Sequence, residues 1–460
     1  MPKHHRLLEL GVKVRWLAIV LAIGIAAPAW ATDTGLTIAT AADVTSKRQA
    51  LINNAWGIGT GVLPGTLPTS VATCSTNPFP SYNVGSCRTF TFTMRYSYTP
   101  NGGPSGNTMT ANLYTAGSPN LNRMIFLNGG HQGPPFDGLW QNFAAHYNMQ
   151  LVIQRLLAHG VSVMAMNMPA YGDYAQHTAT FSTHGVTAMQ DFLEPMNETI
   201  NWLQANAPFN DYNMFGLSGG GWTSDVYPAV DMRIHVSIGT AGSTPGTQFP
   251  SGAYASANHG DCNTSGCYGE QQGAPSPNNF YDLAGYSDIY IMSAYGSSTV
   301  SGRPRYHRQI LNTHDACCFG GDQWAVAAFN YQTYYSSGGG DGTQCGSPAP
   351  TSCTWQTYLT YYSTQITNLM ATLGVGSNPP VVADPVANYH QISDCGDASS
   401  FTVTGGTGAT QTGTCIPANA TAVGGYPDAI SLAIATLDAN PPNPNVVMAG
   451  GTRGLRLGGR

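Results

Sequence analysis

Two patterns of apolar positions divide the chain into predicted strands and predicted helices. Apolar residues alternate with polar ones, or form short runs, in the segments predicted as strands: 89–98, 108–114, 123–127, 161–167, 213–217, 233–238, 308–312 and 380–383. They recur at helical spacing in the segments predicted as helices: 43–56, 140–159, 184–206, 219–227, 281–294 and 357–373. Asp43 is the expected cap of the first helix. Because strands alternate with helices, we predict an α/β fold: a mostly parallel sheet with helices on both faces.

The same pattern predicts one large domain between two segments of different composition. We expect a leader over residues 1–31, a flexible Ala- and Thr-rich segment over 32–43, a single α/β domain over 44–435, and a frayed Pro-, Asn- and Gly-rich tail over 436–460. No repeat of fixed period is present. The chain is long enough to bury a large core, and the sequence leaves the oligomeric state open.

The leader has the pattern of a secretory signal peptide. Basic residues precede an apolar stretch over residues 16–27, and Ala29-Trp30-Ala31 forms an A-x-A-type cleavage site. The stretch is too short to span a bilayer, and no later apolar run approaches the roughly 20 residues that a span needs. The sequence therefore predicts a secreted or periplasmic protein without a membrane span.

Charge is sparse in this chain and excludes several classes of partner. Only 9% of the residues are charged, and the formal net charge is −6. Lys47 is the only lysine after the leader, and no cluster of Lys and Arg is present, so we do not expect nucleic-acid binding. A polar but weakly charged surface fits a neutral substrate, either small or polymeric.

The cysteines indicate an oxidising compartment. All of them follow the leader, and they fall into five close sequential pairs: Cys74 and Cys87, Cys262 and Cys267, Cys317 and Cys318, Cys345 and Cys353, Cys395 and Cys415. Local disulfides are the simplest pairing, although the sequence does not fix the connectivity. Since no C-x-x-C pair and no His at zinc-finger spacing occurs, we expect no metal, and no other cofactor is implied.

A nucleophile-elbow motif supplies the first candidate for chemistry. Gly216-Leu-Ser218-Gly-Gly220 matches G-x-S-x-G, follows an apolar strand and opens a predicted helix. In such a turn the flanking residues are glycines because a side chain would collide with the strand or the helix. The N-terminus of the new helix directs its free N–H groups at the site. We therefore predict that Ser218 is a nucleophile; the alternative is an inert serine in a tight turn.

The acid and the base of such a site should follow the serine in the order Asp or Glu, then His. Asp315 lies just after the strand 308–312, at the end where open α/β sheets place functional loops. The adjacent cysteines 317 and 318 could brace this loop. The competing acids are Asp261, Asp288 and Asp341.

His390 is the only histidine after Asp315 and follows the last predicted strand. We predict that it is the base, while His314, next to Asp315, should point elsewhere. For the oxyanion hole we expect the N–H of Gly219 and a second N–H after an early strand. The segment Asn128-Gly-Gly-His131-Gln132 supplies that loop, so the N–H of His131 is the candidate, with Gln132 one step behind.

Four segments resemble a known superfamily: FLNGGHQG, GLSGGGW with the later RIHVSIGTAGS, ILNTHDACCF, and NYHQIS. They look like secreted bacterial α/β-hydrolases of the dienelactone-hydrolase and esterase type, and the resemblance spans about residues 120–395. It implies the α/β-hydrolase fold and a Ser-Asp-His hydrolase with Ser218, Asp315 and His390 in those roles. The chain departs from the usual pattern by having Asn128-Gly129-Gly130 where a His-Gly pair is common.

The prediction is therefore a secreted serine hydrolase that cleaves carboxylic esters through an acyl-enzyme. Two alternatives remain open: a serine peptidase or amidase on the same fold, and a non-catalytic carbohydrate-binding protein on a hydrolase scaffold. Trp222 and Trp140 are possible pocket residues, although core packing is equally expected of Trp222. The acyl and alcohol specificity and the role of residues 322–356 as a lid are not determined by the sequence.

Overall fold

The structure is a computed structural model of the whole chain. It describes residues 36–75, 83–99, 105–130, 149–170, 179–181, 183–243, 245, 280–313, 355–376, 380–384, 392–393, 400–404, 410–414, 423 and 425–444. Five residues of the predicted site lie outside these ranges: His131, Gln132, Trp140, Asp315 and His390.

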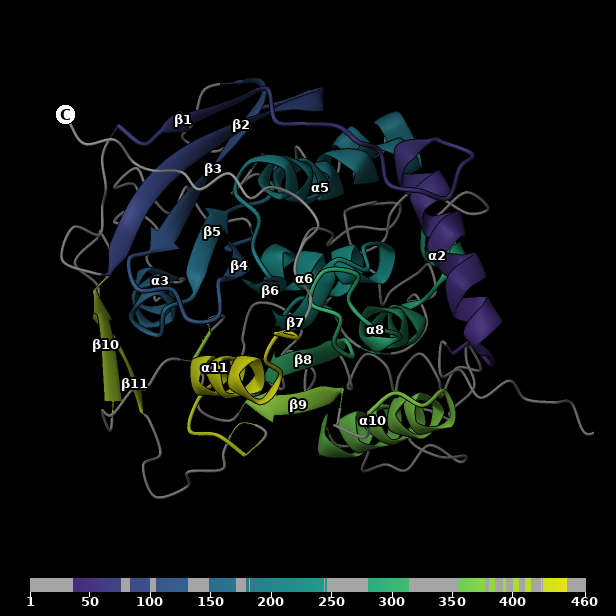
Figure 1. Cartoon of the computed structure of the whole chain (residues 1–460). Coiled ribbons are helices and arrows are strands. Elements are labelled where there is room, and N and C mark those ends of the chain that lie inside the picture. The colour runs from purple at the N-terminus through teal and green to yellow at the C-terminus, as the bar shows by residue number, and fades with distance from the viewer. Residues whose placement is uncertain are drawn as a thin grey trace, which may run out of the picture.

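Strands form one large sheet and a small separate hairpin (Figure 1). The large sheet has the order β1-β2-β3-β5-β4-β6-β7-β8-β9, and β10 pairs with β11. The strand bounds are β1 Ser70–Thr73, β2 Val84–Tyr98, β3 Gly106–Ala116, β4 Arg123–Asn128, β5 Ser162–Met166, β6 Asp211–Leu217, β7 Ile234–Thr240, β8 Tyr306–Asn312, β9 Val381–Asp384, β10 Ser400–Thr404 and β11 Thr410–Thr414. The first strands are antiparallel as far as the β3–β5 pair, and every pair from β5 to β9 is parallel.

Helices cover both faces of this sheet. Their bounds are α2 Ala41–Trp56, α3 Met149–Ala158, α5 Met189–Asn206, α6 Gly219–Val230, α7 Phe280–Leu283, α8 Tyr286–Ala294, α10 Trp355–Thr372 and α11 Ala429–Ala439, with a 3-10 turn, η2, over Gly185–Ala188. The two faces have separate cores: α2, α5, α6, α8 and α10 contribute to one, α3 and α11 to the other. The mostly parallel sheet, its strand order and the strand–turn–helix at Ser218 together make the α/β-hydrolase fold, which confirms the predicted fold class.

Strand β4 shows how the sequence pattern divides between these cores. Met124 and Phe126 belong to the core under α5 and α6, whereas Ile125 and Leu127 belong to the core under α3 and α11. Successive side chains of a strand point to opposite faces, so a strand buried on both faces has a continuous apolar sequence. The parallel centre of the sheet therefore appears in the sequence as short apolar runs.

The first helix is capped differently from the expectation. Thr40 is the N-cap residue, and its side chain accepts a hydrogen bond from the N–H of Asp43. The Asp43 carboxylate in turn accepts from the N–H of Thr40 at 2.8 Å. This is a capping box, in which the residue at N3 supports the cap from inside the first turn. Asp43 is thus part of the cap motif but is not the cap residue.

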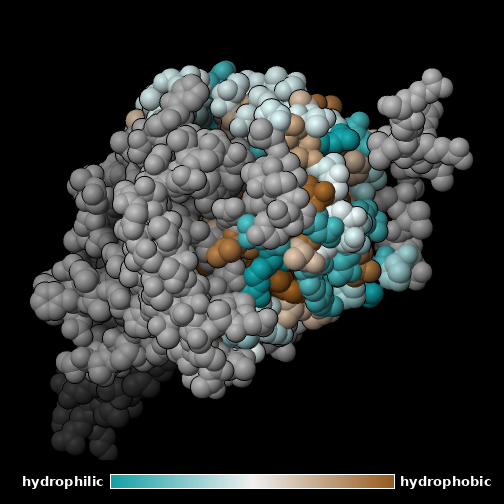
Figure 2. All heavy atoms as spheres, turned by 90° about the vertical axis from the view of Figure 1, so that its left-hand side faces the viewer, coloured by the Kyte–Doolittle hydropathy of each residue, from teal (hydrophilic) through white to brown (hydrophobic). Residues whose placement is uncertain are grey.

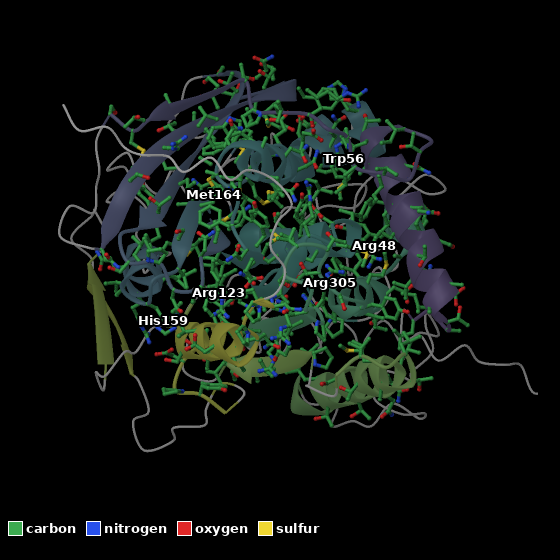
Figure 3. All side chains as sticks on the ribbon, in the orientation of Figure 1. Arg48, Trp56, Arg123, His159, Met164 and Arg305 are labelled. Atoms are coloured by element: carbon green, nitrogen blue, oxygen red, sulfur yellow. A yellow bond between two sulfur atoms is a disulfide. The ribbon has the colours of Figure 1, made fainter. Side chains whose placement is uncertain are left out.

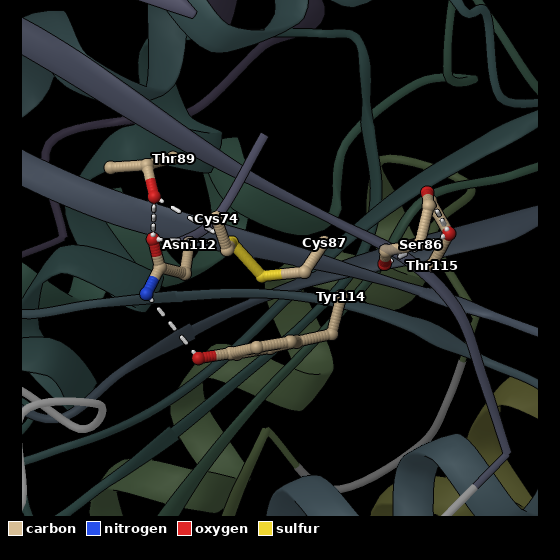
Figure 4. The surroundings of a disulfide bond; sticks show 7 residues. All are labelled: Cys74, Ser86, Cys87, Thr89, Asn112, Tyr114 and Thr115. Carbon is tan, nitrogen blue, oxygen red and sulfur yellow. Dashed lines mark hydrogen bonds between the residues drawn. A yellow bond between two sulfur atoms is a disulfide. The ribbon is translucent and has the colours of Figure 1, made fainter. Parts of the chain in front are cut away.

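One predicted disulfide lies within the described residues. Cys74, just after β1, bonds to Cys87 on β2, and the Cα atoms are 5.4 Å apart (Figure 4). Next to the bond, Asn112 accepts a hydrogen bond from Thr89 at 2.7 Å and donates one to the Tyr114 hydroxyl at 3.3 Å. The bond fastens the short and largely exposed edge strand β1 to the sheet. The other eight cysteines lie outside the described residues.

A buried charge network fastens α11 to the end of the sheet opposite the elbow. Arg123, at the start of β4, lies 3.5 Å from Asp211 and 3.6 Å from Asp438, and it donates to the carbonyl of Asn440 at 3.2 Å. His159 contacts the same Asp438 at 3.0 Å. Figure 3 shows Arg123 and His159 near α11. These contacts keep the Arg123 side chain paired although it is fully buried, as a buried charge requires.

Two carboxyl groups lie close together on α5, one turn apart. Glu194 accepts hydrogen bonds from the Trp56 indole N–H and the Thr66 hydroxyl. Glu198 is 8% exposed, and burial, followed by the charge of Glu194, raises the pKa of its carboxyl to about 8. The helix therefore holds Glu198 in its protonated form at neutral pH.

Because of this pair, we predict that the free energy of unfolding falls as the pH rises. Glu198 takes up a proton more readily in the folded chain than in the unfolded chain, so the stability decreases between about pH 4.5 and about pH 8. Glu198→Gln mimics the protonated form and should raise the free energy of unfolding at pH 8.5 by roughly 2–3 kcal/mol. At pH 4 the two proteins should be equally stable.

Urea unfolding at both pH values measures this effect. Ser46→Ala is the control, because it changes an exposed residue of α2 that carries no titrating group and should shift neither curve. An equal gain for Glu198→Gln at both pH values would show that the pKa of Glu198 is not the cause.

Candidate active site

The candidate active site is built around a strained serine at the junction of β6 and α6. Ser218 has φ 59° and ψ −128°, a backbone conformation that residues other than glycine rarely adopt. Its N–H donates to the carbonyl of Thr240 on β7 at 2.9 Å, and its carbonyl accepts from the N–H of Trp222 at 2.9 Å. The neighbouring strand and the new helix therefore hold this conformation. Such strain is typical of functional positions and is the geometry expected of the elbow motif.

The glycines of the motif are required by close backbone contacts. A Cβ on Gly216 would lie 2.1 Å from the carbonyl oxygen of Gly220, and a Cβ on Gly220 would lie 2.0 Å from the carbonyl oxygen of Asn128. A Cβ on Gly221 would lie 2.4 Å from the carbonyl oxygen of Thr240. Strands β4, β6 and β7 thus approach the first turn of α6 more closely than any side chain allows, which is the reason predicted from the sequence.

A second glycine segment lies against the N-terminus of α6. Gly130 follows β4 and has φ +68°, and a Cβ there would lie 2.9 Å from the amide nitrogen of Gly219 and 2.7 Å from the carbonyl oxygen of Leu217. The first N–H groups of a helix have no partner inside the helix and carry its positive dipole end. The chain after β4 and the chain after β6 therefore meet where N–H groups can bind an anion.

The strands that precede the predicted acid and base end at the same edge of the sheet. β8 ends at Asn312 and β9 at Asp384, the two residues pair in register, and both strands run parallel to β6. The N–H of Thr313 donates to the carbonyl of Asp384 at 2.8 Å. Asp315 follows β8 by three residues and His390 follows β9 by six, and both lie outside the described residues, as do His131, Gln132 and Trp140.

The chain beyond His390 returns to the end of β9. The hydroxyl of Ser393 donates to the Asp384 carboxylate at 2.5 Å and accepts from the N–H of Ala429 at 2.8 Å. Its carbonyl accepts from the N–H of Ile430 at 3.2 Å. The segment between Asp384 and Ser393 is thus fixed at both ends, to the sheet and to the first turn of α11.

The structure places Trp222 in the core and not on a pocket wall. Its side chain is fully buried, its indole N–H donates to the hydroxyl of Tyr281 at 2.6 Å, and its ring meets that of Phe192 edge-on at 5.9 Å. This face of α6 packs between α5 and α7, so the indole cannot reach a substrate at Ser218. Of the two roles considered for Trp222, these contacts are those expected of core packing.

Of the competing acids, Asp288 has a structural role. Its carboxylate accepts from the N–H of Thr37 at 2.8 Å and of Ile38 at 3.1 Å, and it lies 3.4 Å from the ammonium of Lys47. It fastens the segment before α2 to α8. Asp261 and Asp341 lie outside the described residues.

A Ser-His-Asp group that sequence reasoning missed lies inside the molecule, apart from the predicted one. The hydroxyl of Ser237 on β7 lies 2.9 Å from Nδ1 of His307 on β8, and Nε2 of His307 lies 3.6 Å from the carboxyl of Asp225 on α6. All three side chains are buried between the sheet and α6. Their residues come from three elements, so no local sequence signal could have found the group.

Burial determines the chemistry of this group. It lowers the pKa of His307 to about 3 and raises the pKa of Asp225 well above its usual value. The His307 imidazole is therefore neutral near pH 7, and it cannot act as a base for a substrate that cannot reach it. Ser237, His307 and Asp225 form a structural network, which Ser243 extends by donating to Asp225 at 2.6 Å.

Comparisons with known proteins find only distant similarities. No family model and no curated protein sequence matches the chain. Similar solved structures include a CE15 glucuronoyl esterase from Teredinibacter turnerae, with 14% identity, 66% of this chain and 76% of that chain covered, and a TM-score of 0.38. Acetyl xylan esterase 1 from a Thermoanaerobacterium species is 12% identical in sequence. The match covers 65% of this chain and 86% of that chain, with a TM-score of 0.34. A putative dienelactone hydrolase from Klebsiella pneumoniae is 12% identical in sequence. The match covers 54% of this chain and 82% of that chain, with a TM-score of 0.27.

The described residues on the side of the molecule that lies left in Figure 1 have mixed polarity. Figure 2 shows hydrophobic side chains in small groups among hydrophilic ones on the coloured part of this face. None of the helices in the described part of the chain is long and apolar enough to cross a membrane.

Proposed function

We propose that the protein is a secreted serine hydrolase that cleaves carboxylic esters. The observation that carries this proposal is the strained conformation of Ser218 at the start of α6, with the backbone of Gly130 packed against the same helix end. A residue other than glycine in this backbone conformation costs on the order of 1–3 kcal/mol of strain. It persists only where the surrounding structure imposes the conformation. Ser218 stands at the N-terminus of α6, where the first N–H groups of the helix have no partner inside the helix.

In the proposed reaction His390 takes the proton of the Ser218 hydroxyl while its oxygen attacks the ester carbonyl carbon. The carbonyl oxygen becomes an anion, bound by the N–H groups of Gly219 and His131. The intermediate expels the alcohol, which takes the proton from His390, and leaves an acyl group on Ser218. Water then loses a proton to His390 and attacks the acyl carbon. The second intermediate releases the acid as the Ser218 oxygen takes that proton back from His390. Asp315 orients the imidazole and stabilises its charged form.

The topology supports Asp315 and His390 in these roles. Ser218, Asp315 and His390 each follow a strand of the parallel half of the sheet, and β6, β8 and β9 end at one edge. His390 lies two residues before Ile392, and Ser393 is fixed to the end of β9.

Secretion and substrate class are part of the proposal. The leader pattern and the Cys74–Cys87 disulfide support an oxidising compartment outside the cytoplasm. The sparse charge supports a neutral ester, small or polymeric.

Paired substrates test the reaction class. The mature protein, made in an oxidising compartment, is given p-nitrophenyl esters of increasing acyl length and the p-nitroanilides of the same acids. We expect hydrolysis of the esters, with a length preference that measures the acyl pocket, and little or none of the anilides. Faster cleavage of the anilides would identify an amidase or peptidase, and a folded protein that cleaves neither would favour a binding function.

A further inference from the structure

The end of β7 and the residues after it, 240–242, pack against the first turn of α6. The carbonyl of Thr240 accepts a hydrogen bond from the N–H of Ser218 at 2.9 Å. A Cβ on Gly242 would lie 2.0 Å from the amide nitrogen of Trp222, so the two backbones are in direct contact. The position of this segment therefore determines where the backbone of the elbow lies.

Two strained residues stand side by side where β6 and β7 end. Leu217 pairs in register with Thr240, and the residues that follow them, Ser218 and Ala241, have φ 59° and 48°. A residue other than glycine keeps such a conformation only where its surroundings impose it. The N–H of Ala241 donates to the carbonyl of Ile310 on β8 at 2.8 Å, which fixes the segment on the side of the sheet. The side chain two residues further on fixes it on the side of the helices.

That side chain is Ser243, which fastens the segment to two helices. Its hydroxyl donates to the carboxyl of Asp225 on α6 at 2.6 Å and lies 2.7 Å from the hydroxyl of Tyr290 on α8. All three side chains are fully buried, so water cannot replace a partner that is removed. Asp225 lies one turn after Gly221, and the bond therefore joins the segment to the same helix whose first turn it contacts.

We propose that Ser243 is a positioning residue for the nucleophile: its hydroxyl fastens residues 240–242 to α6, so that the Thr240 carbonyl holds Ser218 in its strained conformation. The inference rests on the proposed function and extends it to a fully buried residue that acts through the backbone. A displacement of a reacting group by about 1 Å is enough to lower a rate by about 100-fold. A small movement of this segment therefore has a large effect on the reaction.

The expected effect lies in kcat and not in KM. Ser243→Ala should lower kcat by about 10- to 100-fold, because the nucleophile is no longer held in its productive position. KM should change little, since no contact with the substrate is removed. Tyr290→Phe removes only one of the two bonds to the hydroxyl and should lower kcat less, by about 5-fold. Asp225→Asn should keep most of the rate, because an amide oxygen accepts the same hydrogen bond.

Ser293→Ala is the matched control. Ser293 on α8 is also buried, and its hydroxyl donates to the backbone carbonyl of Asp225 at 2.7 Å. This bond joins α8 to the same residue of α6 but does not fasten the segment after β7. The variant should lose stability as Ser243→Ala does and keep the wild-type kcat, so it separates damage to the packing of α6 from a misplaced nucleophile.

The experiment measures Tm, kcat and KM on one p-nitrophenyl ester for the wild type and these four variants. It also measures the rate at which an alkyl fluorophosphonate labels Ser218, a reaction in which the serine oxygen bonds to phosphorus and fluoride leaves. The proposal expects the labelling rate to fall with kcat in Ser243→Ala and, to a smaller extent, in Tyr290→Phe. It should stay near the wild-type rate in Asp225→Asn and Ser293→Ala.

Wild-type kcat and labelling rate in Ser243→Ala would overturn the proposal and leave the serine hydrolase intact, and so would an equal loss of both in Ser293→Ala. If Ser243→Ala does not fold, Tyr290→Phe decides, because an unchanged labelling rate in that variant contradicts the proposal. A folded wild type that neither hydrolyses an ester nor reacts with the fluorophosphonate would overturn both this proposal and the proposed function.

Discussion

Replacing Ser218 with alanine should reduce kcat/KM for a p-nitrophenyl ester by about 10⁴-fold or more. The hydroxyl is the atom that forms the acyl-enzyme, and the oxyanion donors and binding contacts alone supply only the residual rate. The folded state should survive, because the Ser218 side chain makes no capping hydrogen bond to α6. Removal of the side chain also leaves the strained backbone contacts in place.

The second Ser-His-Asp group provides the control for this variant. Ser237→Ala removes the serine that contacts His307 inside the molecule and should retain nearly the full rate per folded molecule. Steady-state kinetics of both variants, with circular dichroism to confirm folding, decide between the two serines. Activity that survives in Ser218→Ala and is lost in folded Ser237→Ala would show that the elbow has been misidentified.

Gly220→Ala should be the most damaging small substitution at the site. Its methyl group would lie 2.0 Å from the carbonyl oxygen of Asn128, a backbone atom in the centre of the sheet. Either β4 or the first turn of α6 must move, which costs about 1–3 kcal/mol of stability or more. The same movement separates the chain after β4 from the helix end, so the rate should fall by about 10²-fold or more.

Gly65→Ala is the control for this change, because a Cβ there meets no atom within 4 Å. The comparison requires Tm and kcat for both variants. A Gly220→Ala protein with wild-type Tm and rate would mean that β4 and α6 do not approach as closely as the structure shows.

Much of the fold could be predicted because its central strands are buried on both faces. Their short apolar runs distinguish them from the helices, and β4 to β8 lie within a few residues of their predicted bounds. Strand β1 was missed because it is held by backbone pairing and a disulfide at an exposed edge, where no apolar alternation is needed. Helix α11 was missed although its signals were present: Asp428 caps it, and its apolar residues face one core. The Pro- and Gly-rich sequence on both sides of α11 favoured the prediction of an irregular tail over that of a helix.

The site was predictable to the extent that local geometry determines it. The motif at Ser218 places a serine between a strand and a helix, and the strain at that position follows from the motif alone. The hydrogen bond between Ser243 and Asp225 depends on how α6 packs against the end of β7, which no local pattern specifies. Trp222 illustrates the same limit, because only the packing of α5 and α7 shows that its indole is enclosed.

The central claim, that Ser218 is the nucleophile of an ester hydrolase, is tested most directly by trapping the acyl-enzyme. The mature protein is mixed with a p-nitrophenyl ester whose acyl group is released slowly, quenched in acid during the burst of p-nitrophenol, and digested for mass spectrometry. The account predicts one acyl group per molecule, on the peptide that contains Gly216 to Trp222, at Ser218. An acyl group on another residue, or turnover without any acylated peptide, would contradict it.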